Sequence, residues 1–291
     1  MNIVLGPNRY GKAETHLVRI YRETPRHRIR DLLVSTSLQG DFEAAHVSGD
    51  QSAVLPTDTQ KNTVFAYAKA HGVGEIEDFA LRLARHFVAD VQSVTGSRID
   101  VDEYEWERID AGDRGHDHAF VRNGREVRTT TVTVEAGDQV VVVSGLKDLT
   151  VLKSTGSEFH GFLRDRYTTL ADTTDRILAT SLEARWRYLA ADIDWSTAYS
   201  HVRALLLETF ANTHSKALQH TLWGMGRGVL EARPDIAEIH LTAPNKHHFA
   251  VDLSPFGLDN PGEVFYAADR PYGLIEATVR RDHSRADAGR E

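Results

Sequence analysis

The order in which strand-forming and helix-forming segments follow one another constrains the fold of this chain more than any other feature. In the first half, two segments with β-branched and apolar residues between turn residues predict strands. Two helical segments follow. The clearer one, at 75–96, repeats apolar side chains every three or four residues before Gly96, its expected C-terminal end. Strand patterns then return, and a hairpin turn is expected at Gly137. The strands expected in this half are 15–22, 28–40, 98–110, 126–137 and 138–154.

The second half of the chain repeats this order of elements, although its residues do not match those of the first half. We therefore expect an α+β protein of two tandem units, 1–140 and 141–291, each with paired helices on one face of an antiparallel sheet. Long amphipathic strands at a sheet edge need partners, so we expect the sheets to close by oligomerisation. A polar tail from about residue 283 is expected to be frayed. The other elements expected here are strands at 184–193, 236–243, 247–254, 262–269 and 273–281 and helices at 196–212 and 215–234.

Composition excludes several classes of protein. The 291 residues carry 34 Lys and Arg against 42 Asp and Glu, a net charge of −8, and no dense basic cluster, which argues against nucleic acid as a partner. The absence of cysteine excludes disulfides, thiolate metal sites and a cysteine nucleophile. No apolar run is long enough to span a membrane, and neither a signal peptide nor a peroxisomal C-terminal signal is recognisable. We expect a cytoplasmic protein with no membrane partner.

Motifs for metals and nucleotides are weak. His116 and His118 alternate in "HDH" and would share a face of a strand, where they could bind a metal with a third ligand, but a solvent-facing turn is the favoured interpretation. His247 and His248 are adjacent and would point to opposite faces of a regular strand, so they cannot easily share a metal. The glycines of "GMGRG" at 224–228 lie in a helical pattern and favour close helix packing over nucleotide binding. The sequence predicts no metal site.

Three polar segments are poorly explained by local structure. "LPTDTQKNT" at 55–63 has the composition of a helix N-terminus capped by Thr57, Asp58 or Thr59. "KSTGSEFHGFLRDRYTTL" at 153–170 places Phe159 among glycines and polar residues, where it is either a core residue or a stacking surface for a flat ring. "APNKHHF", at 243–249, has the turn chemistry expected before a strand. Shortly after the second segment, Asp172 and Asp175 are expected to begin a helix.

Taken together and in this order, segments along about residues 5–282 resemble the urate oxidase (uricase) family. The central segment, "GLKDLTVLKSTGSEFHGFLRDRYTTLADTTDRILAT", is the most specific, whereas any of the short motifs alone would carry little weight. The other matching segments are "RYGKAETHLVRI" (9–20), "PTDTQKNT" (56–63), "LQH" (218–220) and "APNKHHFAVDL" (243–253).

The resemblance implies both a fold and a reaction. The fold is the tunnelling fold, with two such units in each subunit and four subunits closing into a barrel-like homotetramer whose active sites lie at subunit interfaces. The reaction converts urate, O2 and water to 5-hydroxyisourate and H2O2 without a metal or an organic cofactor. Urate and O2 are therefore the expected small-molecule partners.

The resemblance also implies which residues recognise the substrate. Phe159 would stack on the purine, and Arg176 and Gln219 would bind one edge of the ring. Leu218 would contribute a backbone contact. These roles suit a planar anion with alternating donors and acceptors, because a guanidinium and an amide make directional hydrogen bonds to such an edge.

A second group of residues would handle protons and O2 by the same resemblance. Lys12 and Thr57 would form a proton-handling dyad, with Thr57 and Asp58 supplied by a neighbouring subunit. Asn245 and His247 would hold O2 or the attacking water, and His247 would belong to the proton relay. The hydroxyl of a threonine suits a relay because it both donates and accepts.

Two positions depart from the family pattern and two other functions compete. Position 218 is Leu where a small branched residue is expected, and His160 stands where Trp is also common.

One alternative function is that of another tunnelling-fold enzyme that acts on a purine or pterin with zinc, which the absence of cysteine disfavours. The other is a non-catalytic purine-binding oligomer, in which Lys12, Thr57 and His247 would have no role.

Overall fold

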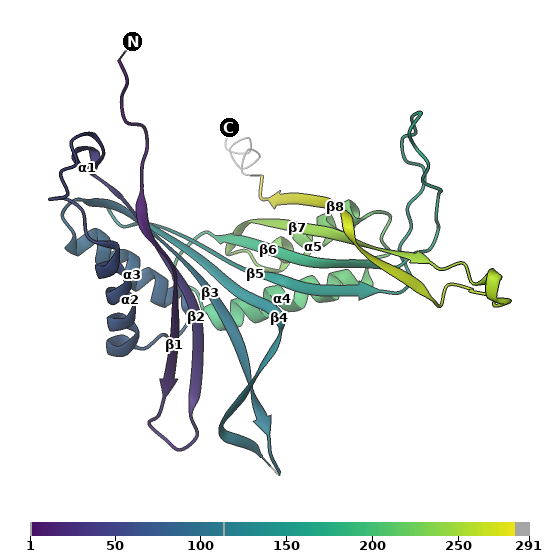
Figure 1. Cartoon of the computed structure of the whole chain (residues 1–291), viewed down its shortest axis with the longest axis horizontal. Helices are drawn as coiled ribbons and strands as arrows, with labels where there is room; N and C mark the ends of the chain where they lie inside the picture. Colours follow the sequence, from purple (N-terminus) through teal and green to yellow (C-terminus); the bar gives the residue numbers. More distant parts are fainter. Residues whose placement is uncertain (1, 113, 283–291) are drawn as a thin grey trace, which may run out of the picture. The chain divides into compact units, whose positions relative to one another are not determined.

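The computed structural model describes residues 2–112 and 114–282 (Figure 1). The expected tail from about residue 283 lies outside these residues. The chain divides into two compact units, Met1–Gly145 with Arg187–Ala198 and Leu146–Trp186 with Tyr199–Glu291. Within each unit the strands are hydrogen-bonded in sequence order, and helices pack against them. The α+β class with antiparallel pairing is confirmed.

In the first unit, helices pack on one face of an antiparallel sheet (Figure 1). The helix expected at 75–96 packs on the third and fourth strands, and its apolar stripe, including Phe79, Leu83 and Phe87, is fully buried. The expected hairpin turn is confirmed, with Gly137 at φ 85°. The elements from the N-terminus are β1 (Tyr10–Tyr21), β2 (Arg28–Gly40), α1 (Glu43–Val47), α2 (Thr57–His71), α3 (Ile76–Asp90), β3 (Val94–Asp110), β4 (Gly115–Glu135) and β5 (Gln139–Lys153).

Two helix ends differ from the sequence prediction. α3 ends at Asp90 rather than Gly96, because Gly96 pairs within the sheet with both β2 and β4 and so belongs to β3. The cap predicted for α2 is wrong: Pro56 occupies the N-cap position, Thr57 is already helical, and no side chain caps the helix. The fixed φ of proline suits the entrance of a helix. Because no side chain caps α2, the polar side chains that follow Pro56 are not used as caps.

A buried ion pair joins α3 to the sheet. Arg128 on β4 lies 2.8 Å from Glu77, whose side chain is 1% exposed, and 2.7 Å from Glu75. Burial raises the pKa of Glu77, while the charge of Arg128 and a hydrogen bond from Ser144 oppose that rise. Removing one partner of such a pair leaves an uncompensated charge in the core.

The remaining elements include two strands that are longer than predicted. Strands expected at 236–243 and 247–254 form one strand that runs through Pro244, which pairs with Leu274. The last two expected strands are likewise one strand, which pairs with β7 on both sides of a register shift that leaves residues 269–272 outside the ladder. The sixth strand begins before the expected residue 184. These elements are β6 (Leu178–Tyr188), α4 (Trp195–Asn212), α5 (Leu218–Ala232), β7 (Ile236–Ala250), the 3-10 turn η1 (Ser254–Phe256) and β8 (Phe265–Arg280).

Close packing of α5 on β7 and β8 explains the glycine-rich sequence of that helix. A Cβ on Gly226 would lie 2.5 Å from Val279 Cγ2 and 3.3 Å from Ile239 Cγ2, so no larger residue fits without a shift. The prediction that these glycines allow close helix packing is confirmed at Gly226. None of the described helices is long and apolar enough to cross a membrane.

Candidate functional site

A pocket of ≈ 730 Å³ in the second unit is lined by six of the predicted site residues. They come from three places in the chain: the long loop between β5 and β6, the start of α5, and the second half of β7. The six residues are Phe159, Arg176, Leu218, Gln219, Asn245 and His247.

The loop between β5 and β6 is held by its own backbone. Phe159 and Thr173 exchange two hydrogen bonds, with N···O distances of 2.8 and 3.0 Å. The Arg176 amide donates to the carbonyl of Ser157 at 2.8 Å. Because the backbones of Phe159 and Arg176 are both hydrogen-bonded within the loop, their side chains have defined positions.

Two aspartates help to close this loop rather than begin a helix. Asp175 Oδ1 accepts hydrogen bonds from Thr155 Oγ1 at 2.9 Å and from the Gly156 amide at 3.2 Å. Asp172 accepts one from the Gly161 amide at 3.2 Å. The sequence prediction of a helix start was wrong, because short acidic side chains satisfy loop amides as readily as helix amides.

Arg176 and Phe159 form the polar and aromatic wall of the pocket. The guanidinium carbon of Arg176 lies 5.0 Å from the centre of the Phe159 ring. Phe162 stacks on Phe159 with 4.9 Å between ring centres and 12° between planes. Burial lowers the pKa of Arg176, and its Nε is buried with no hydrogen-bond partner among the described residues. A partly desolvated cation with a free donor favours an anionic, hydrogen-bonding ligand.

The start of α5 supplies the second wall. Ala217 occupies the N-cap position without a side-chain cap, and Leu218 is buried while the Gln219 side chain is exposed to the pocket. The first N–H groups of a helix lack partners within it and carry partial positive charge. The Glu158 amide donates to the carbonyl of Ser215 at 2.8 Å, which ties the Phe159 loop to this helix start.

β7 supplies the third wall, at a register shift. Its pairing with β8 slips between Asn245 and His247, and both His247 and His248 line the pocket, although a regular strand would point them to opposite faces. Burial lowers the pKa of His247, and the positive charge of Arg176 lowers it further. Near neutral pH the His247 imidazole is therefore uncharged and can accept a proton.

The other three predicted residues belong to the first unit. Lys12 is half-buried on β1, and its amide donates to Thr36 Oγ1 at 3.2 Å. Thr57 is the half-buried first residue of α2. Asp58 is exposed and is paired with Lys61, whose hydrogen bond and charge are the main causes that lower the pKa of Asp58.

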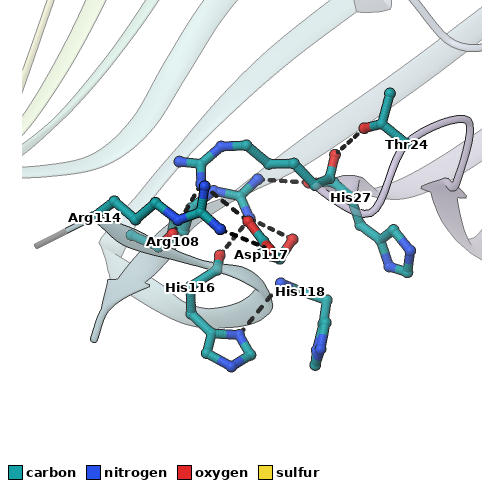
Figure 2. A network of polar contacts seen from close by, with 9 residues as sticks. Thr24, His27, Arg108, Arg114, His116, Asp117 and His118 are labelled. Atoms are coloured by element: carbon teal, nitrogen blue, oxygen red, sulfur yellow. Dashed lines mark hydrogen bonds and ion pairs between the residues drawn. The ribbon is translucent and has the colours of Figure 1, made fainter. Parts of the chain in front are cut away.

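The histidines considered for metal binding lie in a hairpin network (Figure 2). The His116 and His118 ring centres are 4.5 Å apart, and His27 lies 6.0 Å from His118. Arg108 organises this region by donating to the carbonyls of His116 and Asp117 at 2.6 and 2.7 Å. Residues 2–112 and 114–282 contain no group of three or more His, Asp or Glu that could hold a metal ion.

Several residues of the pocket wall were not predicted from the sequence. They include Leu170 and Ile177 from the long loop, and Phe265 and Ile275 from β8. These are ordinary apolar side chains, and no local pattern distinguishes them from core residues. The place of Phe265 and Ile275 in the pocket depends on how β8 pairs with β7.

Most of the chain matches the family model described as Uricase, over residues 8–133 and 142–276. The uricase of Arthrobacter globiformis is 57% identical over 285 residues, which cover 98% of this chain and 92% of that relative. The uricase of Danio rerio is 38% identical over 277 residues, covering 94% and 93%. The crystal structure of the Arthrobacter globiformis uricase aligns with a TM-score of 0.93 at 57% identity, over 99% of this chain and 98% of that one. A uricase structure from Bacillus fastidious aligns with a TM-score of 0.81 at 26% identity, over 94% and 93%.

Proposed function

The chain belongs to the uricase family, and from this premise we propose that it is a urate oxidase. It converts urate, O2 and water to 5-hydroxyisourate and H2O2, with urate losing two electrons to O2. The observation that carries the proposal is the ≈ 730 Å³ pocket whose wall includes six residues matching the family motifs. We further propose that the reaction needs neither a metal nor an organic cofactor.

Substrate recognition rests on the pocket wall of the second unit. The half-buried Arg176 guanidinium, with its free Nε donor, suits one edge of an anionic purine, and the Gln219 amide adds a donor and an acceptor to that edge. Phe159 lines the pocket with an aromatic ring, which would stack on the flat purine. Leu218 contributes its backbone at the start of α5.

Proton transfer and O2 are assigned to the remaining residues. Lys12 and Thr57 remove a proton from bound urate, and the electron-rich dianion then reduces O2. His247 accepts protons in the relay, which its lowered pKa supports, and Asn245 holds O2 or the attacking water with it. Asp58 contacts the substrate largely through its backbone amide.

The assembly is part of the proposal. We propose two tandem tunnelling-fold units, 1–140 and 141–291, in a barrel-like homotetramer, with Thr57 and Asp58 donated to the pocket of a neighbouring subunit. Two large side chains on β8 are exposed, Tyr266 to 64% and Leu274 to 56%. Their exposure supports an assembly in which another subunit covers this edge of the sheet. A cytoplasmic location stays a prediction.

The proposed reaction is tested with purified protein treated with a chelator and then given urate. We expect O2 consumption, peroxide formation and no loss of rate on chelation.

Lys12→Met should lower kcat far more than it weakens urate binding, since proton removal is an interaction of the transition state. Lys69→Met, at an exposed position near the end of α2, is the matched control and should leave both unchanged. Tight urate binding without turnover would instead indicate a non-catalytic purine-binding protein.

A further inference from the structure

Gln60 is a buried polar residue at a position where α2 otherwise presents apolar side chains to the core. The three buried residues of this helix are Gln60, Val64 and Ala68, which are spaced by four and so share one face. Gln60 is 0% exposed. A residue that only filled the core at this place would be apolar, because a buried amide costs free energy unless it is hydrogen-bonded.

The side-chain oxygen of Gln60 is held by the strand beside Lys12. Thr36 Oγ1 on β2 donates to Gln60 Oε1 at 2.6 Å, and Thr36 is itself only 4% exposed. The same hydroxyl accepts the Lys12 amide at 3.2 Å. The Thr36 hydroxyl thus uses its proton toward Gln60 and a lone pair toward Lys12.

The backbone around Lys12 is set closely against Thr36. A Cβ on Gly11 would lie 1.7 Å from the Thr36 carbonyl oxygen, so β1 approaches β2 as only glycine allows. The β1–β2 register then shifts between Lys12 and Thr15. Lys12 is the last residue paired before this irregularity, and the Thr36 hydroxyl binds its amide there.

The other end of the Gln60 side chain reaches the entrance of α2. Gln60 Nε2 donates to the carbonyl of Leu55 at 3.4 Å, and that carbonyl also accepts the Tyr10 hydroxyl at 3.0 Å. Leu55 directly precedes Pro56, and Thr57 follows as the first helical residue. One buried amide therefore contacts both Thr36, whose hydroxyl binds the Lys12 amide, and Leu55, which lies two residues before Thr57.

We propose that Gln60 and Thr36 are positioning residues that hold Lys12 and the start of α2 at Thr57 in their working arrangement. Neither side chain touches the substrate. The inference rests on the proposed function, in which Lys12 and Thr57 handle the proton of urate.

Three substitutions test this role. Gln60→Met keeps the length of the side chain but removes both hydrogen bonds, and Thr36→Val removes only the hydroxyl. Because a misplacement of about 1 Å in a reacting group costs up to roughly 100-fold in rate, we expect kcat for urate to fall by about 10- to 100-fold while KM changes by less than about twofold. Thr36→Ser, which keeps the hydroxyl, should restore most of kcat.

A matched control separates positioning from general loss of stability. Thr130 is another buried threonine of the same unit, 2% exposed on β4 and bonded to the carbonyl of Val143. Thr130→Val should destabilise the protein to a similar extent with kcat unchanged. If the core variants do not fold, Tyr10→Phe removes only the hydroxyl contact to Leu55 and keeps the ring packed on Phe42. It should still lower kcat at unchanged KM.

The outcomes distinguish this inference from the proposed function. If the unchanged protein does not oxidise urate, both are overturned. If it does, and Lys12→Met is inactive, then an unchanged kcat in folded Thr36→Val and Gln60→Met proteins overturns the positioning role alone. A fall in kcat that Thr36→Ser does not restore, or that Thr130→Val reproduces, also overturns it.

Discussion

Replacing Gly226 by alanine should weaken the packing of α5 against β7 and β8. A Cβ at this position would lie 2.5 Å from Val279 Cγ2, 2.9 Å from Val279 Cβ and 3.3 Å from Ile239 Cγ2. Non-bonded carbon atoms pack at about 3.5–4.0 Å. Val279 or the helix must therefore retreat by about 1 Å, the difference between this spacing and the 2.5 Å contact.

The size of the effect follows from two opposing contributions. Overpacking a well-filled core costs about 1–3 kcal/mol. Alanine in a helix interior is about 1 kcal/mol better than glycine. The net change at Gly226 is a loss of about 0–2 kcal/mol in the free energy of unfolding.

Gly224 of the same helix is the matched control. A Cβ on Gly224 would meet Thr209 Cγ2 at 3.7 Å and Thr213 Oγ1 at 3.8 Å, which are ordinary contacts. Gly224→Ala should therefore stabilise the protein by about 1 kcal/mol. Because the helix propensities cancel, the two variants should differ by about 1–3 kcal/mol, the overpacking cost alone.

Urea unfolding followed by tryptophan fluorescence measures this difference. The protein concentration is kept equal in all samples, since association of subunits stabilises the folded state by mass action. Val279→Ala should relieve the clash, so the Gly226→Ala and Val279→Ala substitutions should be less costly together than their sum. Equal shifts in the unfolding midpoint for Gly226→Ala and Gly224→Ala would refute the reasoning. The position of α5 on the sheet matters for function because Gln219, which lines the pocket, lies at the start of this helix.

Two further predictions concern charge. Arg176→Gln removes a positive charge that helps to lower the pKa of His247, so that pKa should rise in an NMR titration of the free protein; an unchanged titration would contradict the assignment. Arg128→Met leaves Glu77 buried without its cation and should destabilise the first unit by about 3–5 kcal/mol at neutral pH. Burial already raises the pKa of Glu77 in the folded protein. The loss should therefore shrink as the pH falls through that raised pKa and the carboxyl becomes neutral, which denaturant unfolding at several pH values measures. A pH-independent loss would show that the charges are not its cause.

Strong periodic signals predicted the elements of the fold but not all of their ends. α3 was recognised because its apolar residues recur on one face, yet its end was placed at Gly96 instead of Asp90. A glycine after a helical pattern is a common stop, but this glycine is held by pairing with two neighbouring strands. Pro244 was likewise read as a break, whereas the long β7–β8 ladder carries the strand through it.

The polar stretch before α2 illustrates what local rules miss. Its composition matches a capped helix, but Pro56 occupies the N-cap position of α2 and no side chain caps the helix. Gln60 was grouped with the residues of an ordinary helix start, although it is fully buried against Thr36. Twenty-four residues separate these two side chains in the chain, so only the packing of α2 on the sheet brings them together.

The sequence by itself determined the α+β class, the repeated order of elements and, through its motifs, the uricase family, because each of these is written in neighbouring residues or in the order of segments. Only the tertiary structure decided where distant residues meet. It brought Phe159, Arg176 and His247 to one pocket and lowered the pKa of His247 by burial and by the charge of Arg176. It also set the 2.5 Å approach that requires glycine at position 226. Such features depend on packing, strand register and desolvation, which no stretch of sequence specifies alone.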